Sequence, residues 1–301
     1  MEPWVIGLVA VSAVLHLAWN VRLKTAGDPL RAATIGMVAG SVAIVPLGFA
    51  VWWAQGRVAL PPEGIVLGLA SGVVEAAYFI FLAAAYRRGD LSVVYPLARG
   101  TAPLLAVIIG VGLLGERLGV AGSLGVIALL IGFFWLQRPW RALAVARTGG
   151  AGARRAAADS AILYALATGV MIATYSAIDR VGTRQIDPFP YAAILWLTCS
   201  VVLVVWVGLI AGGDLLRNGP EAAQRAAVGG WLTLVAYLCI LVALSVAPLS
   251  GVAPLRESAT VFAAAWGAVR LGEASDRSEV VRRVGASVLI VGGALLLAFG
   301  G

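Results

Sequence analysis

Four charged side chains stand inside otherwise apolar segments of this sequence. Arg99 lies in "VVYPLARGTAPLL", Glu75 in "ASGVVEAAYFIF", and Arg256 and Glu257 in "GVAPLRESATV". A charge at the centre of a bilayer costs at least about 2.5–3.5 kcal/mol, so it requires a partner or a water-filled cavity. An arginine can grip a carboxylate or phosphonate, and a glutamate can hold an amino group. These residues therefore indicate either a site for a small zwitterion or a set of charges that only neutralise one another.

The first apolar segment carries a second polar pattern, "SAVLHLAWNVRLK". Ser12, His16, Asn20 and Lys24 recur every fourth residue and so share one stripe of a helix. Lys24 stands at the end of the segment as a solvated anchor, whereas His16 and Asn20 lie deeper and either face a cavity or bond their own backbone. Because His16 is the only histidine, we expect no histidine metal cluster, and no residue pattern predicts a metal site or a cofactor.

The composition is that of a polytopic membrane protein. The 301 residues are 61% hydrophobic and 12% charged, against about 45–50% and about 25% in soluble domains. A bilayer core about 30 Å thick needs roughly 20 apolar residues in a helix. Ten segments meet this requirement, at about 4–24, 31–54, 64–86, 91–114, 118–137, 159–179, 189–212, 226–247, 249–271 and 281–299.

The distribution of Lys and Arg predicts the orientation of these segments. The net charge is +7, which we assign to basic loops beside a membrane and not to nucleic-acid binding. Sixteen of the 22 basic residues fall in the connectors after the first, third, fifth, seventh and ninth segments, four fall on the opposite side, and Arg99 and Arg256 lie inside helices. Basic loops stay in the cytoplasm, so both termini of a multi-pass inner-membrane protein are predicted to be periplasmic.

Two parts of the chain repeat one another in order. Residues 78–116 and 237–273 share a tyrosine, a Leu-Ser pair, a Pro-Leu pair and a closing Leu-Gly-Glu. Asp28-Pro29 likewise corresponds to Asp187-Pro188. The basic, Gly/Ala-rich stretch between the halves reads as a linker. The predicted domains are a first five-helix repeat at 1–137, a linker at 138–158 and a second five-helix repeat at 159–301.

Each half has an odd number of helices, so the second copy must be inverted relative to the first. The predicted fold is therefore an all-α membrane protein with ten transmembrane helices in two inverted five-helix repeats. Secondary transporters use this architecture, and matched interrupted helices in the two halves mark their binding site. Pro96 and Pro254 form such a pair. Arg99 and Glu257 occupy matching positions beside them, each about 12 Å from opposite faces at 1.5 Å per residue.

The arrangement resembles the EamA-type transporters of the drug/metabolite transporter superfamily. The resemblance rests on two five-helix halves, each with a proline in its fourth helix and Gly-Glu at that helix's end, in "LLGERL" and "RLGEAS". It implies export or exchange of small metabolites, often amino acids, by alternating access. Typical members place both termini inside, and in this respect the charge distribution of the chain departs from the family.

The resulting prediction is a non-enzymatic secondary transporter for a small polar metabolite, with substrate bound by Arg99, Glu75, Glu257, His16, Asn20, Tyr78 and Tyr95. A carboxyl that ionises only when the cavity is wet could couple proton movement to transport; a permanent salt bridge to an arginine is the alternative for Glu75. A lipid-linked sugar flippase and a non-transporting scaffold or sensor remain alternative functions. The lipid bilayer is the expected surrounding and a monomer is compatible with the sequence. No nucleophile–base pair or paired aspartates indicate an enzyme.

The predicted orientation can be tested with reporters fused at Gly301. Because the basic connectors should stay in the cytoplasm, a phosphatase fusion in a bacterial host should be active and a fluorescent-protein fusion dark. The reverse pattern would contradict the orientation and leave the repeat intact.

Overall fold

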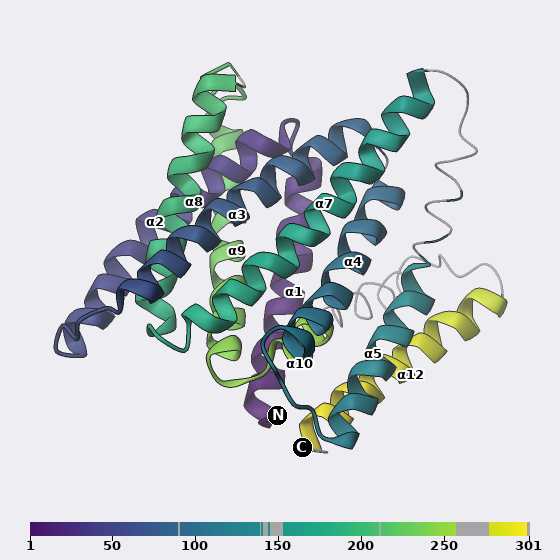
Figure 1. Cartoon of the computed structure of the whole chain (residues 1–301). Coiled ribbons are helices and arrows are strands. Elements are labelled where there is room, and N and C mark those ends of the chain that lie inside the picture. The colour runs from purple at the N-terminus through teal and green to yellow at the C-terminus, as the bar shows by residue number, and fades with distance from the viewer. Residues whose placement is uncertain are drawn as a thin grey trace.

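The computed structural model of the chain describes residues 1–89, 91–138, 140, 144, 153–210, 212–256 and 277–299. The regular elements in these ranges are helices (Figure 1). They are α1 (Pro3–Thr25), α2 (Pro29–Ala54), α3 (Pro62–Arg88), α4 (Leu91–Gly112), α5 (Val120–Gln137), α7 (Ala153–Gly182), α8 (Pro188–Ile210), α9 (Pro220–Val246), α10 (Leu249–Arg256) and α12 (Arg277–Phe299).

Six of these helices, α1, α2, α3, α7, α8 and α9, are long and apolar enough to cross a membrane. Three further helices contain shorter apolar stretches within the residues that the structure describes. Their apolar parts are Leu97–Gly112 in α4, Val120–Leu136 in α5 and Val284–Leu297 in α12. The span expected at 249–271 is described only as far as Arg256. The all-helical membrane fold is thus observed, and the number of ten spans stays a prediction.

The second helix of each half begins with the same local signal. Asp28 accepts hydrogen bonds from the backbone N–H groups of Leu30 (3.2 Å) and Arg31 (3.3 Å). Asp187 accepts in the same way from the N–H of Phe189, at 3.0 Å. An Asp at the N-cap satisfies an otherwise unpaired N–H, and the following Pro needs no hydrogen bond at the first helical position. The Asp-Pro pairs matched in the sequence therefore start equivalent helices, α2 and α8.

The main helix–helix interfaces join one half of the chain to the other. These interfaces occur in equivalent pairs, as two related copies require. The α3–α7 interface corresponds to α9–α1, and the α2–α9 interface corresponds to α8–α3. The α4–α7 interface corresponds to α10–α1. Three further interfaces, α2 with α8, α4 with α10 and α5 with α12, pair equivalent helices. Contacts within a half are much smaller. The fold is therefore two interlocked repeats and not two bundles side by side.

The two halves run in opposite senses. In Figure 1, α1 starts at the end of the molecule that holds both termini, whereas α7 starts at the opposite end. The N-terminal ammonium of Met1 donates a hydrogen bond to the carbonyl of Leu297 in α12, at 2.9 Å. The repeats are thus inverted, as the odd number of helices in each half predicts.

Glycines allow the closest of these helix contacts. A Cβ on Gly36 of α2 would lie 3.0 Å from the Cα of Gly230 in α9, and a Cβ on Gly230 would overlap the backbone of Gly36. On the other side of the bundle, a Cβ on Gly72 of α3 would lie 2.6 Å from the carbonyl oxygen of Leu195 in α8. Small residues let helix backbones approach in this way when helices associate in lipid.

Gly230→Ala should therefore destabilise the protein, by about 1–3 kcal/mol for overpacking. Gly229→Ala is the matched control, since it is the neighbouring residue of α9 and a Cβ there meets no atom within 4 Å. The apparent Tm of purified protein should fall for Gly230→Ala and stay level or rise for Gly229→Ala. Equal Tm values would contradict the close approach of α2 and α9.

Candidate functional site

Four charged side chains are buried at the junction of the two repeats. The first repeat contributes Glu75 from α3 and Arg99 from α4, which are 3% and 8% exposed. The second repeat contributes Asp179 from α7 and Arg256 from α10, which are 0% and 4% exposed. We call these four residues the central charged cluster. In their ionised forms the two acids and two bases sum to zero, which lowers the cost of keeping charges out of water.

The members of the cluster interact electrostatically across the repeat boundary. Glu75 interacts with Asp179 and with Arg256. His16 of α1 interacts with both Arg256 and Arg99, and its role in binding substrate stays a prediction.

Asp179 is the member of the cluster that the sequence analysis missed. The predicted span ended at this residue, whereas α7 continues to Gly182. The carboxylate accepts hydrogen bonds from the hydroxyl of Tyr191 on α8, at 2.9 Å, and from that of Tyr237 on α9. Ser71 of α3 lies close to the same carboxylate. One fully buried acid thus ties three helices of the second repeat together and faces the first.

The repeat itself carried a signal for Asp179. The pair Asp28-Pro29 precedes Asp187-Pro188 by 159 residues, and the same offset relates Asn20 to Asp179. The offset also relates His16 to Tyr175. The polar stripe of α1 and the buried polar stripe of α7 are therefore equivalent positions in the two copies.

Glu75 has the hydrogen-bonding capacity that a ligand would use. Within the described ranges, its Oε2 atom is buried and has no hydrogen-bond partner. A buried carboxylate oxygen normally has a partner, because leaving it without one costs free energy. Its equivalent in the second repeat is Leu234, so the shared fold does not require an acid there.

Some of the polar groups in the stripe on α1 form hydrogen bonds within the helix itself. The Nδ1 atom of His16 lies 3.2 Å from the Ser12 hydroxyl and 3.1 Å from the Ser12 carbonyl oxygen. The side-chain amide of Asn20 donates to the His16 carbonyl, at 2.7 Å. His16 is buried and Asn20 is partly buried. These bonds fix the orientation of both side chains, and their role as ligands stays a prediction.

A continuous row of aromatic rings crosses the site. Successive ring centroids lie 4.7–6.1 Å apart, along Trp19, Phe79, Tyr78, Tyr175, Tyr237 and Trp196. The predicted site residue Tyr78 lies in the middle of this row and interacts electrostatically with Arg99 and Glu75. Neighbouring rings in the row are perpendicular or tilted relative to each other, which is an arrangement that aromatic pairs favour. It connects the Asp179 region to α1.

The structure describes the predicted site residues of the fourth and ninth segments unequally. Glu257 lies outside the described residues. Tyr95 and Pro96 belong to α4, but the structure describes only their backbone. Pro254 lies inside α10 and is buried. The proposed pairing of Arg99 with Glu257 therefore stays a prediction.

The Gly-Glu motif at the end of the fourth helix has a clear structural role. The carboxylate of Glu116 accepts from the N–H groups of Leu249 (2.6 Å) and Ser250 (2.9 Å) at the start of α10, and from the Ser250 hydroxyl (2.7 Å). It also pairs with Arg180 of α7, at 3.3 Å. An acid at a helix start satisfies its unpaired N–H groups and favours its dipole. The motif thus fastens the first repeat to the second.

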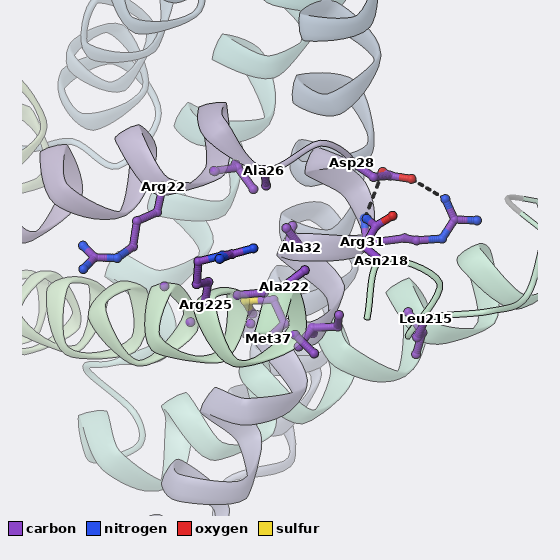
Figure 2. A pocket seen from close by; sticks show the side chains of 18 of the residues that line it. Arg22, Ala26, Asp28, Arg31, Ala32, Met37, Leu215, Asn218, Ala222 and Arg225 are labelled. Carbon is purple, nitrogen blue, oxygen red and sulfur yellow. Dashed lines mark hydrogen bonds and ion pairs between the residues drawn. The ribbon is translucent and has the colours of Figure 1, made fainter. Parts of the chain in front are cut away.

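A pocket of about 330 Å³ opens between α1, α2 and α9, near the C-terminal end of α1 (Figure 2). Trp19 and Phe79 form part of its lining. These two rings begin the aromatic row, and the lining of the pocket includes none of the four residues of the central charged cluster. Nothing in the sequence indicated this pocket, since its walls come from residues 19–37, 79 and 215–233, which are far apart in the chain.

Comparison with known proteins places these features in a family. The model of the EamA-like transporter family matches residues 3–137 and, a second time, residues 159–299. One solved crystal structure resembles the chain with a TM-score of 0.70 and 22% sequence identity, over 98% of this chain and 96% of its own. At this identity the likeness establishes a shared fold. No curated protein matches the sequence.

Removing the Asp179 carboxylate should destabilise the second repeat. Asp179→Ala leaves two buried tyrosine hydroxyls without their acceptor, at about 1–3 kcal/mol each. Asp159→Ala is the control, because Asp159 lies on the same helix and is exposed. Only the first variant should lower the apparent Tm, and adding Tyr191→Phe and Tyr237→Phe should restore part of the loss. A wild-type Tm for Asp179→Ala would show that the three-helix junction does not depend on the acid.

Proposed function

Because the chain belongs to the EamA-like transporter family, we propose that it is a secondary transporter for an amino acid or a related zwitterion. It would move this substrate across an inner membrane by alternating access, in export or exchange. The observation that carries the proposal is the central charged cluster. Each repeat supplies one acid and one arginine to the cluster, and all four side chains are buried.

The composition of the cluster suits a ligand that has both signs of charge. Arg99 presents a planar fork that can hold a carboxylate by two parallel hydrogen bonds. Glu75 offers a buried oxygen that has no partner among the described residues, and this oxygen can accept a hydrogen bond from an ammonium group. A zwitterion would enter without changing the net charge of the site. A singly charged ligand would leave an excess charge buried, which is costly.

The interlocked repeats support alternating access. The cluster residues come from α3, α4, α7 and α10, and the interfaces α3–α7 and α4–α10 run between the repeats. A rocking motion of one inverted repeat against the other would change which partners the four charges meet. In transporters built from inverted repeats, such motion exposes a site near the midplane to one side at a time.

Counterflow in proteoliposomes tests the function directly. Wild-type protein loaded with an unlabelled amino acid should take up the same labelled amino acid from a panel. Arg99→Lys should fold with an unchanged Tm and exchange about tenfold more slowly, because lysine keeps the charge but lacks the fork. Arg217→Lys, at an exposed loop position, is the matched control and should exchange normally.

Two results would contradict this assignment. Wild-type exchange rates in a well-folded Arg99→Lys or Arg99→Ala protein would remove Arg99 from the site. Failure of the wild-type protein to exchange any amino acid of the panel would refute the substrate class.

A further inference from the structure

The pocket between α1, α2 and α9 is more basic than the central site. The described residues that line it include three arginines, Arg22, Arg31 and Arg225, and a single acid, Asp28. Figure 2 shows Arg22 of α1 and Arg225 of α9 extending into the space between these two helices, while Arg31 turns toward Asp28. Unlike the central charged cluster, the described lining of this pocket therefore holds more basic than acidic side chains.

The one acid is already engaged by its neighbours. Asp28 forms an ion pair with Arg31 and also accepts from two N–H groups at the start of α2. Arg31 is buried and donates its Nε–H to the carbonyl of Asp214, at 3.0 Å. Asp28 and Arg31 thus neutralise each other as a structural pair. Arg22 and Arg225 are exposed, and both line the pocket.

The start of α9 adds to this positive field. Gly219, Ala222 and Ala223 line the pocket. Gly219 is the N-cap of α9, has a φ of +82°, and provides no side chain to cap the helix. The first N–H groups of a helix and its dipole together favour a bound anion. Two guanidinium groups and the start of α9, whose first turn also carries Glu221, therefore lie at one cavity.

The rest of the wall is apolar and limits what kind of anion fits. Leu23 and Met37 join Trp19 and Phe79 in the lining. A volume of about 330 Å³ is at the lower end of the range for small-molecule sites, about 300–1,000 Å³. A bare inorganic ion would leave most of this space and its apolar wall unoccupied. A ligand with an anionic head and a small apolar body would fill both parts.

We propose that this pocket binds an oxyanion of the phosphate class attached to a small apolar body, at a site separate from the central charged cluster. Guanidinium forks match the geometry of phosphate oxygens. A soluble organic phosphate and an anionic lipid headgroup share this chemistry, and basic pockets between membrane helices bind such headgroups. The proposal does not depend on the transported substrate, because binding is measured without transport.

Ligand-induced stabilisation of the purified protein tests the site. The protein is placed in phosphatidylcholine nanodiscs and its Tm is followed during titration with phenyl phosphate. In a second arm, phosphatidylglycerol replaces part of the phosphatidylcholine. Arg225→Gln and Arg22→Gln should each weaken the response about tenfold, as the loss of one charge-assisted contact predicts. Arg217→Gln, an exposed arginine of the α8–α9 loop outside the pocket lining, should keep the wild-type response.

The two arms identify the source of the oxyanion. A wild-type response to phenyl phosphate that Arg225→Gln weakens would assign a soluble organic phosphate. A response only to phosphatidylglycerol, with the same dependence on Arg225, would assign a lipid headgroup. The proposal is overturned if neither probe stabilises the wild-type protein. It is equally overturned if Arg217→Gln loses the response as fully as Arg225→Gln, since general surface charge would then explain the binding.

Discussion

Charges that are buried inside a bundle of membrane-spanning helices need partners, and this requirement organises the molecule. Glu75, Arg99, Asp179 and Arg256 are each at most 8% exposed, and an isolated charge at such a depth costs several kcal/mol. Each repeat contributes one acid and one arginine to the cluster. Across the repeat boundary Glu75 is attracted by Arg256 and repelled by Asp179, so the attractive interaction of Glu75 with Arg256 forms only when both repeats are in place.

The packing of the helices also requires both repeats to be present. The main interfaces of most helices lie in the opposite repeat, and the backbones meet closely at Gly36–Gly230 and Gly72–Leu195. Glu116 of the first repeat satisfies the N-terminal N–H groups of α10 in the second. An isolated repeat would leave these polar groups and small-residue faces without partners. The interlocked fold therefore keeps the charges together within two equivalent, oppositely directed units.

The sequence was sufficient for the features that depend on local patterns and on repetition. The all-α membrane class, the inverted repeats, the correspondence of the two Asp-Pro pairs and the burial of Glu75 and Arg99 could all be predicted. Asp179 was missed because hydropathy ended the span at that residue, although the 159-residue offset from Asn20 pointed to it. The partners of Glu116 and the basic pocket could not be predicted, because residues far apart in sequence form them. The structure places His16 and Tyr78 beside the cluster, while Glu257 stays a prediction.

In the proposed transport site, Glu75 holds the amino group of the substrate. The most direct test compares counterflow of an amino acid with counterflow of its des-amino carboxylate, in wild-type protein and in Glu75→Gln. If Glu75 contacts the amino group, Glu75→Gln should slow exchange of the amino acid about tenfold or more, as loss of a charge-assisted contact predicts. The variant should leave exchange of the des-amino analogue close to its wild-type rate. An equal loss of exchange rate for both compounds would show that Glu75 only pairs with protein groups, and would contradict its contact with the substrate.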